Sequence, residues 1–466
     1  MRLPRIAIVA FVMVALFCLP SLIYTGSYIV SDTPVPMEGV EPSPYPDEPL
    51  TEGFLFVVLD GGRKDMMSDP NFMPNLNRRV ADGAYLEVRT NPLTMTAMCV
   101  KAMATGVPSR PNEALQNFRP QHPGSIDGFN LASTFDGDGN GDPDNHVGVI
   151  GDYVWKHLVF DREKAPFYEA RYGHADYYRG DEEGFEELKR WARGAPPEGH
   201  SIPRNLIVAH LSGLDSVGHR YGALDSPEYE EKLRWIDTNL EEVFQELPDD
   251  WTVVVTSDHG LTDSGQHGSD LDILRDVAAF MWGPNVKEGA VVKGVQQRDL
   301  ATLPSVLFSL PLPHAVHGRI PLDAFDISEA KRQQLNQWNW DAAVARNDWL
   351  IEEGHPHIEG LTSEKIEWER LNVDEIGLRT SDFVLSALAV LSISGVLIYA
   401  LRELKQSKKV VFWSTISFVT TAVLSMTLSY NRDTLALFYY PVGLWLPVGI
   451  FVGGLLILQH EKWKHH

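Results

Sequence analysis

WTVVVTSDHG, residues 251–260, decides the fold of this chain. Its β-branched residues predict a buried strand, which delivers Asp258 and His259 at its carboxyl end. Open α/β sheets place their ligands at that end, and an Asp-His pair is a frequent metal ligand. Asp-His-Gly is also an ordinary turn sequence, so the rest of the chain must decide between a metal site and a turn.

Three further apolar runs predict strands, at residues 54–59, 147–150 and 206–209. Segments of helical pattern separate the strands, including an amphipathic stretch over residues 229–247, and the alternation continues to about Phe325. We therefore predict an α/β fold over residues 53–327, with a mostly parallel central sheet and helices on both faces.

Residues 97–105 have helical composition and end at Gly106, which places Thr96 at the helix N-terminus. Free backbone N–H groups and the helix dipole favour an anion at this position. Threonine is also a common N-cap, so a purely structural role for Thr96 is the alternative.

Candidate metal ligands follow the ends of the predicted strands. We predict a first metal site that consists of Asp60, Thr96, Asp258 and His259. A second site, with an open position for substrate or water, consists of Asp215, His219 and His267. Oxygen and imidazole donors without thiolate favour two zinc ions, and manganese is a possible substitute.

An acidic, glycine-rich loop lies at Asp136–Asp144 and alternates oxygen donors with glycine, as calcium loops do. The twelfth position is Val147, where an EF-hand needs a bidentate glutamate. Both a calcium site and a solvated acidic turn therefore remain open.

The two ends of the chain predict membrane segments. Residues 1–30 carry Arg2 and Arg5 before an apolar run, which indicates a retained transmembrane anchor or, alternatively, a signal peptide. Residues 31–52 form a proline-rich tether, and residues 328–380 a helical connector. Three apolar spans are predicted within residues 381–466, at Phe383–Leu401, Val410–Tyr430 and Leu435–Leu458.

Basic residues set the expected orientation. They lie in the loop at 402–409 and in the C-terminal tail, so the positive-inside rule places both termini in the cytoplasm and the catalytic domain outside it. The net charge of −23 argues against nucleic acid as a partner. Cys18 and Cys99 lie in such different segments that we expect no disulfide between them.

Several motifs together carry a family resemblance. They are Asp60 after its strand, TMT at 94–96, ATG at 104–106, DSVGH at 215–219, DHG at 258–260 and HG at 267–268. In this order they resemble the alkaline phosphatase superfamily, in its type I phosphodiesterase branch. GDYVWK at 151–156, residues 210–222, QRDL at 297–300 and PLP at 311–313 look most like the GPI ethanolamine-phosphate transferases. The resemblance covers residues 54–325.

This resemblance implies an alkaline phosphatase-like fold and a covalent phosphothreonine intermediate on Thr96. It also implies substrate contacts by Asp152, Trp155, Lys156 and His210. The expected reaction moves phosphoethanolamine, or a similar head-group phosphate, from a membrane phospholipid to a lipid-linked or surface acceptor. The alternative is hydrolysis of nucleotide or lipid phosphodiesters.

The chain also departs from the family pattern. Only three spans follow the catalytic domain, and Pro92 is displaced from the Thr-x-Thr motif, which leaves Thr94 as a second candidate nucleophile. CVKAM at 99–103 is not the Cys-x-Pro-x-Arg motif that sulfatases need, so sulfatase chemistry is not expected.

Overall fold

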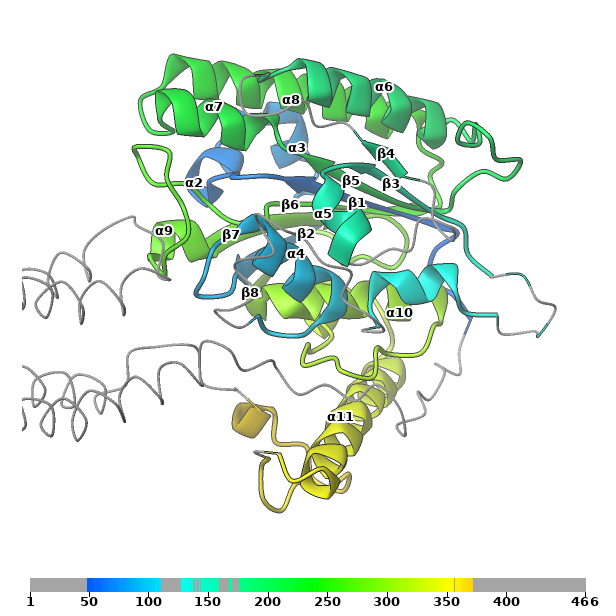
Figure 1. Ribbon diagram of the computed structural model, residues 1–466. Coiled ribbons are helices and arrows are strands. Elements are labelled where there is room, and N and C mark those ends of the chain that lie inside the picture. The colour runs from blue at the N-terminus through cyan, green and yellow to red at the C-terminus, as the bar shows by residue number, and fades with distance from the viewer. Residues whose placement is uncertain are drawn as a thin grey trace, which may run out of the picture. The chain divides into compact units, whose positions relative to one another are not determined.

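The computed structural model describes residues 48–109, 127–136, 139, 142, 144–158, 167–169, 176–355 and 357–371. One eight-stranded sheet has the order β4-β3-β5-β1-β6-β7-β2-β8 (Figure 1). The strands are β1 Gly53–Leu59, β2 Gly83–Arg89, β3 Val147–Gly151, β4 Phe167–Glu169, β5 Leu206–Leu211, β6 Trp251–Thr256, β7 Asp276–Trp282 and β8 Ala290–Gln296.

The sheet is mostly parallel, as predicted, with one exception. β1 runs parallel to β5 and β6, β3 runs parallel to β4 and β5, and β2 runs parallel to β8. β7, however, is antiparallel to both β6 and β2. The chain leaves β6 through a long loop at the carboxyl edge and returns along the neighbouring position, which reverses its direction. An all-parallel sheet would have required a crossover to the opposite edge at this point.

Helices cover both faces of the sheet, as predicted. Side chains of β1 alternate between two cores: Phe54, Phe56 and Val58 pack on one face, and the intervening residues pack on the other. In Figure 1, α6, α7 and α8 lie over one face, and α4 and α10 over the other. The α-helices are α2 Lys64–Met67, α3 Pro74–Arg78, α4 Thr96–Thr105, α5 Tyr153–Leu158, α6 Arg179–Ala192, α7 Gly213–Tyr221, α8 Pro227–Glu246, α9 Asp272–Arg275, α10 Leu303–Phe308 and α11 Glu329–Glu352.

Short 3₁₀ helices complete the chain path: η2 Phe129–Ser133, η3 Gln297–Thr302, η4 Leu322–Ala324 and η5 Trp368–Leu371. The predicted amphipathic helix is α8. Ser226 caps its first turn by accepting a hydrogen bond from the Tyr229 backbone N–H at 3.3 Å. In the predicted connector, Ser328 caps α11 in the same way through the Lys331 N–H.

Among the described residues, no helix combines the length and the apolar character that a membrane crossing requires. The predicted anchor at residues 1–30, the tether up to residue 47 and the three spans within 381–466 lie outside those residues.

Candidate metal centre

The register of the three central strands brings the first candidate ligands together. Val58 of β1 lies opposite His210 of β5 and opposite Thr256 of β6. Asp60 follows Val58 by two residues, and Asp258 follows Thr256 by two residues. Because neighbouring parallel strands end at one edge, both carboxylates emerge side by side there.

Asp60, Asp258 and His259 form a buried cluster at this edge. His259 Nε2 lies 3.3 Å from Asp258 Oδ2 and 3.6 Å from Asp60 Oδ1. Asp258 Oδ2 and His259 Nε2 form no hydrogen bond with any described residue, although both atoms are buried. Buried polar atoms without partners are costly, so this arrangement favours a bound cation.

Asp215, His219 and His267 form the second cluster. Asp215 and His219 lie one turn apart on α7, with 3.3 Å between Asp215 Oδ2 and His219 Nε2. His267 comes from the loop after β6, and its Nε2 lies 3.2 Å from His219 Nε2 and 3.8 Å from Asp215 Oδ1. Asp60, Asp215 and His259 also lie close enough to share an ion, so the two clusters adjoin.

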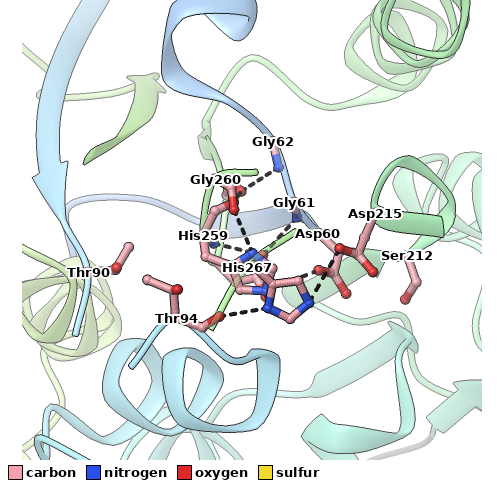
Figure 2. A network of polar contacts seen from close by, with 12 residues as sticks. Asp60, Gly61, Gly62, Thr90, Thr94, Ser212, Asp215, His259, Gly260 and His267 are labelled. Atoms are coloured by element: carbon pink, nitrogen blue, oxygen red, sulfur yellow. Dashed lines mark hydrogen bonds and ion pairs between the residues drawn. The ribbon is translucent and has the colours of Figure 1, made fainter. Parts of the chain in front are cut away.

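Two histidines have the tautomer that leaves Nε2 free to bind a metal. His267 Nδ1 lies 2.8 Å from the Thr94 carbonyl oxygen, and His259 Nδ1 lies 3.2 Å from the Gly260 carbonyl oxygen (Figure 2). A carbonyl oxygen only accepts, so both Nδ1 atoms carry the proton and both Nε2 atoms offer a lone pair. Tetrahedral zinc, with bonds of about 2.0–2.1 Å, places its donor atoms roughly 3.3 Å apart. The Nε2 and carboxylate spacings fit such an ion.

Electrostatics at the first cluster also fit a cation. Burial raises the pKa of Asp258 well above its ordinary value, and the neighbouring charge of Asp60 raises it further. Burial lowers the pKa of His259 well below its ordinary value, and His267 adds to this effect. His259 is therefore neutral and able to bind metal, whereas the adjacent carboxylates repel each other until a cation compensates them.

Thr96 is the first residue of α4, and it is not the N-cap, because Met95 occupies that position. The carboxylates of Asp258 and Asp60 act on Cys99, one turn further along: burial raises the pKa of its thiol, and these two charges raise it more.

The hydroxyl of Thr94, the other candidate nucleophile, is held by two hydrogen bonds. It donates to the Ser269 carbonyl at 2.9 Å and accepts from the Gly268 N–H at 2.9 Å. The Thr96 hydroxyl forms no hydrogen bond with the described residues.

Of the four residues predicted to contact substrate, three are buried in or beside the sheet and one lies against β4. His210 lies inside β5, whose last residue is Leu211, and not beyond the strand end as expected. Trp155 is buried and donates its indole N–H to His210 Nδ1 at 2.9 Å. Asp152 is also buried and accepts from the Val154 N–H and the Ser212 hydroxyl. Lys156 lies over the Phe167 ring, with its Nζ 3.9 Å from the Glu169 carboxylate of β4.

The structure gives two residues a place beside the first cluster that the sequence did not predict: His210 was expected to contact substrate, and Gln297 had no predicted role. His210 groups with Asp60 and Asp258 as closely as a ligand would. Gln297, at the start of η3, is buried and donates its amide to the Asp258 carbonyl at 2.7 Å. Gln297 is the first residue of the QRDL motif. That motif was the only feature of the sequence that could have identified Gln297 as a site residue.

The calcium prediction for Asp136–Asp144 falls partly outside the described residues, which exclude Asp138 and Asn140. Asp136 accepts a hydrogen bond from the Gly139 N–H at 2.8 Å, a contact that closes a turn.

Comparison with known proteins gives the following relationships. Residues 148–307 match the family model described as type I phosphodiesterase / nucleotide pyrophosphatase. The catalytic subunit of GPI ethanolamine phosphate transferase 3 from Mus musculus is 25% identical over 247 residues, which cover 52% of this chain and 21% of that protein. GPI ethanolamine phosphate transferase 2 from Kluyveromyces lactis is 26% identical over 309 residues, or 59% of this chain and 37% of that protein.

The chain thus matches only a minor part of each of these longer relatives, to which it is distantly homologous. Among solved structures, murine ectonucleotide pyrophosphatase / phosphodiesterase 5 aligns with a TM-score of 0.40 and 15% identity, over 56% of this chain and 96% of that one. The buried Asp/His clusters are consistent with the metal sites typical of the alkaline phosphatase superfamily.

Proposed function

Because this chain belongs to the type I phosphodiesterase/nucleotide pyrophosphatase family, we propose that it is a metal-dependent phosphotransferase. It moves phosphoethanolamine, or a similar head-group phosphate, from a membrane phospholipid to a lipid-linked or surface acceptor. The donor and acceptor classes follow the names of the curated relatives, the GPI ethanolamine phosphate transferases.

The observation that supports this proposal best is the pair of adjoining Asp/His clusters at one sheet edge. Asp60, Asp258 and His259, with Thr96, would hold one zinc ion, and Asp215, His219 and His267 would hold the other; manganese is the substitute. When bound, two such cations neutralise charge on the attacking and leaving oxygens of a phosphodiester.

The chemical step on the protein is carried by Thr96. Its Oγ attacks phosphorus and loses its proton, the bond from phosphorus to the glycerol oxygen breaks, and diacylglycerol leaves as the protonated alcohol. The acceptor hydroxyl then attacks the phosphothreonine, the bond from phosphorus to Thr96 Oγ breaks, and the threonine is restored. The N-terminus of α4 would hold the non-bridging oxygens.

Exposure distinguishes the two clusters and supports this order of events. The side chain of His219 is 31% exposed and that of His267 13%, whereas His259 is fully buried. The acceptor would therefore enter on the side of the second cluster. In this proposal the chain is an integral membrane protein with its catalytic domain extracytoplasmic and both termini cytoplasmic, which keeps the site beside its lipid donor.

A hydrolase is the second candidate, because the matching family model is described as a phosphodiesterase and nucleotide pyrophosphatase. Water would replace the acceptor hydroxyl in the second half-reaction. The same clusters and the same Thr96 would serve both reactions, so the destination of the phosphoryl group separates them.

The test uses the purified full chain, supplied with zinc and with phosphatidylethanolamine labelled in its head group. We expect label on the wild-type protein and none on Thr96→Ala, with turnover lowered by roughly 10³-fold or more. Thr238→Ala, on the exposed side of α8, is the matched control and should behave as wild type.

The destination of the label then decides between the two candidates. Transfer to membrane acceptors supports the transferase, and release of free phosphoethanolamine supports the hydrolase. If zinc binds but neither diacylglycerol nor labelled protein forms, the phospholipid donor is wrong. If Thr96→Ala takes up label like the wild type, Thr96 is not the nucleophile.

A further inference from the structure

His210 has the opposite tautomer to that of the two candidate ligand histidines. The indole N–H of Trp155 donates to His210 Nδ1 at 2.9 Å. An indole nitrogen can only donate, so Nδ1 must be the unprotonated acceptor. Neutral His210 therefore carries its proton on Nε2, the position at which His259 and His267 offer a lone pair.

The protonated nitrogen faces the first cluster. His210 Nε2 lies 3.6 Å from Asp60 Oδ2, and His259 Nε2 lies 3.6 Å from the other oxygen, Asp60 Oδ1. His210 and His259 are fully buried, and Asp60 nearly so. The two oxygens of Asp60 thus have different neighbours, an N–H group on one side and a lone pair on the other.

We propose that His210 is a positioning residue for Asp60 and not a metal ligand. At 3.6 Å, His210 Nε2 and Asp60 Oδ2 lie just outside hydrogen-bond distance, and the buried Nε2 has no hydrogen-bond partner among the described residues. With the metal bound, Nε2–H would close on Asp60 Oδ2 and donate to it, which turns Oδ1 toward the cation shared with Asp258 and His259. Trp155 fixes the His210 tautomer from behind. The inference rests on the metal site of the proposed function, and it gives His210 and Trp155 positioning roles in place of the substrate contacts that the family resemblance implied. Groups that orient a ligand in this way commonly change metal affinity by about 10–100-fold.

The backbone around Gly151 fixes the positions of His210 and Trp155 relative to each other. Gly151 ends β3 opposite His210, and a Cβ at Gly151 would meet the His210 carbonyl oxygen at 1.9 Å. The glycine has a φ of +110°, and the next residue, Asp152, donates its N–H to the same carbonyl at 3.2 Å. Helix α5 begins directly afterwards and carries Trp155. The GDYVW motif therefore delivers the indole to the imidazole.

The competing interpretation makes His210 a ligand, since its Nε2 lies with oxygens of Asp60 and Asp258 in a group that could hold an ion. That interpretation needs the proton on Nδ1. It would leave two N–H groups, from Trp155 and from His210 itself, pointing at each other across 2.9 Å. The two interpretations therefore predict opposite tautomers and opposite responses to substitution.

The first experiment measures the tautomer directly. The full chain is labelled with ¹⁵N at its 16 histidines, and the His210 signals are assigned by their absence in His210→Gln. We expect a protonated Nε2 and an unprotonated Nδ1 in the metal-free and the zinc-loaded protein alike. Trp155→Phe should introduce the Nδ1-protonated form. A proton on Nδ1 in the wild type, or a His210 signal shifted by direct zinc coordination, would overturn the inference.

The second experiment measures zinc content and affinity by chelator competition. His210→Gln keeps an N–H donor near the position of Nε2, and His210→Leu keeps the bulk without the donor. We expect zinc to bind about 10–100-fold more weakly to the Leu variant, and affinity within a few-fold of wild type for the Gln variant. Equal affinities for the two variants, or loss of a zinc ion from both, would contradict the positioning role.

Failure of the proposed function can be distinguished from failure of the His210 inference. A wild type that binds no zinc contradicts the metal centre itself, and the histidine spectrum of that metal-free protein still decides whether His210 donates from Nε2. A wild type that binds zinc but transfers no phosphoryl group contradicts the reaction and leaves the zinc comparison of the two His210 variants intact.

Discussion

Thr94 and Thr96 differ in what their hydroxyls contact, although only one residue separates them. Thr94→Val removes a donor to the Ser269 carbonyl and an acceptor for the Gly268 N–H, and leaves both groups buried. We expect the free energy of unfolding to fall by about 1–3 kcal/mol. Chemical unfolding of the full chain measures this, with Thr238→Val, on exposed α8 surface, as the control expected to change it by less than about 0.5 kcal/mol. If Thr94→Val and Thr238→Val lower the free energy of unfolding equally, the Thr94 hydrogen bonds contribute little to stability.

At the same scale, the types of the site residues were readable from sequence, but their protonation was not. Asp60 and Asp258 follow continuous apolar strands, so a strand-end site could be predicted for them. The tautomer of His267 depends on the Thr94 carbonyl, and that of His210 depends on Trp155. These partners lie 173 and 55 residues away in the sequence, and only the fold brings them into contact.

At the scale of elements, a buried ion pair supports the helix that carries half of the second cluster. Lys232 of α8 lies 2.8 Å from Asp181 of α6, and the other oxygen of Asp181 accepts from the Gly213 N–H at the start of α7. Asp215 and His219 follow on α7. The Lys232–Asp181 pair therefore connects three helices at the point where α7 leaves the sheet.

Removing the lysine should be costly, because it leaves the Asp181 charge buried and uncompensated. We expect Lys232→Met to lower the free energy of unfolding by about 3–5 kcal/mol, and the double variant with Asp181→Asn to recover part of that loss. Burial lowers the pKa of Lys232, which fits its fully buried ammonium. Urea unfolding of the wild type, both single variants and the double variant measures the coupling. If the double variant loses as much unfolding free energy as the two single variants together, Lys232 and Asp181 are not coupled.

Element type could be predicted where the apolar pattern was continuous, and not at the sheet edge. β1, β5 and β6 are buried on both faces, which gives the unbroken apolar runs that identified them. β8 at one edge of the sheet has no regular alternation, because Lys293 and Gly294 are both exposed where its pairing with β2 shifts register. Three-residue β4 at the other edge is too short to give a pattern. The reversed direction of β7 depends on the loop path after β6 and has no signature in strand composition.

At the scale of the whole molecule, the sequence predicts the division into a central domain and apolar ends. It does not distinguish the transferase from the hydrolase. The formal charge of −23 and the apolar pattern of the two ends are readable from composition alone. Transferase and hydrolase share the same strand-end ligands, so their difference lies in what reaches the second cluster. The partly exposed side chain of His219 marks where the acceptor would enter in the proposed reaction.

Stability of the whole domain should depend on zinc and pH together. Burial and the charge of Asp60 raise the folded-state pKa of Asp258 above its ordinary value of 3.8. In the metal-free protein, the stability from a protonated Asp258 is full below about pH 4 and is lost as the pH rises through the raised pKa. Bound zinc compensates the ionised carboxylate, so zinc should raise Tm more at about pH 8 than at about pH 5. Thermal unfolding with zinc or with a chelator measures this. Asp258→Asn should remove most of the difference, and an equal gain in Tm at both pH values would refute the assignment of Asp258 to the metal.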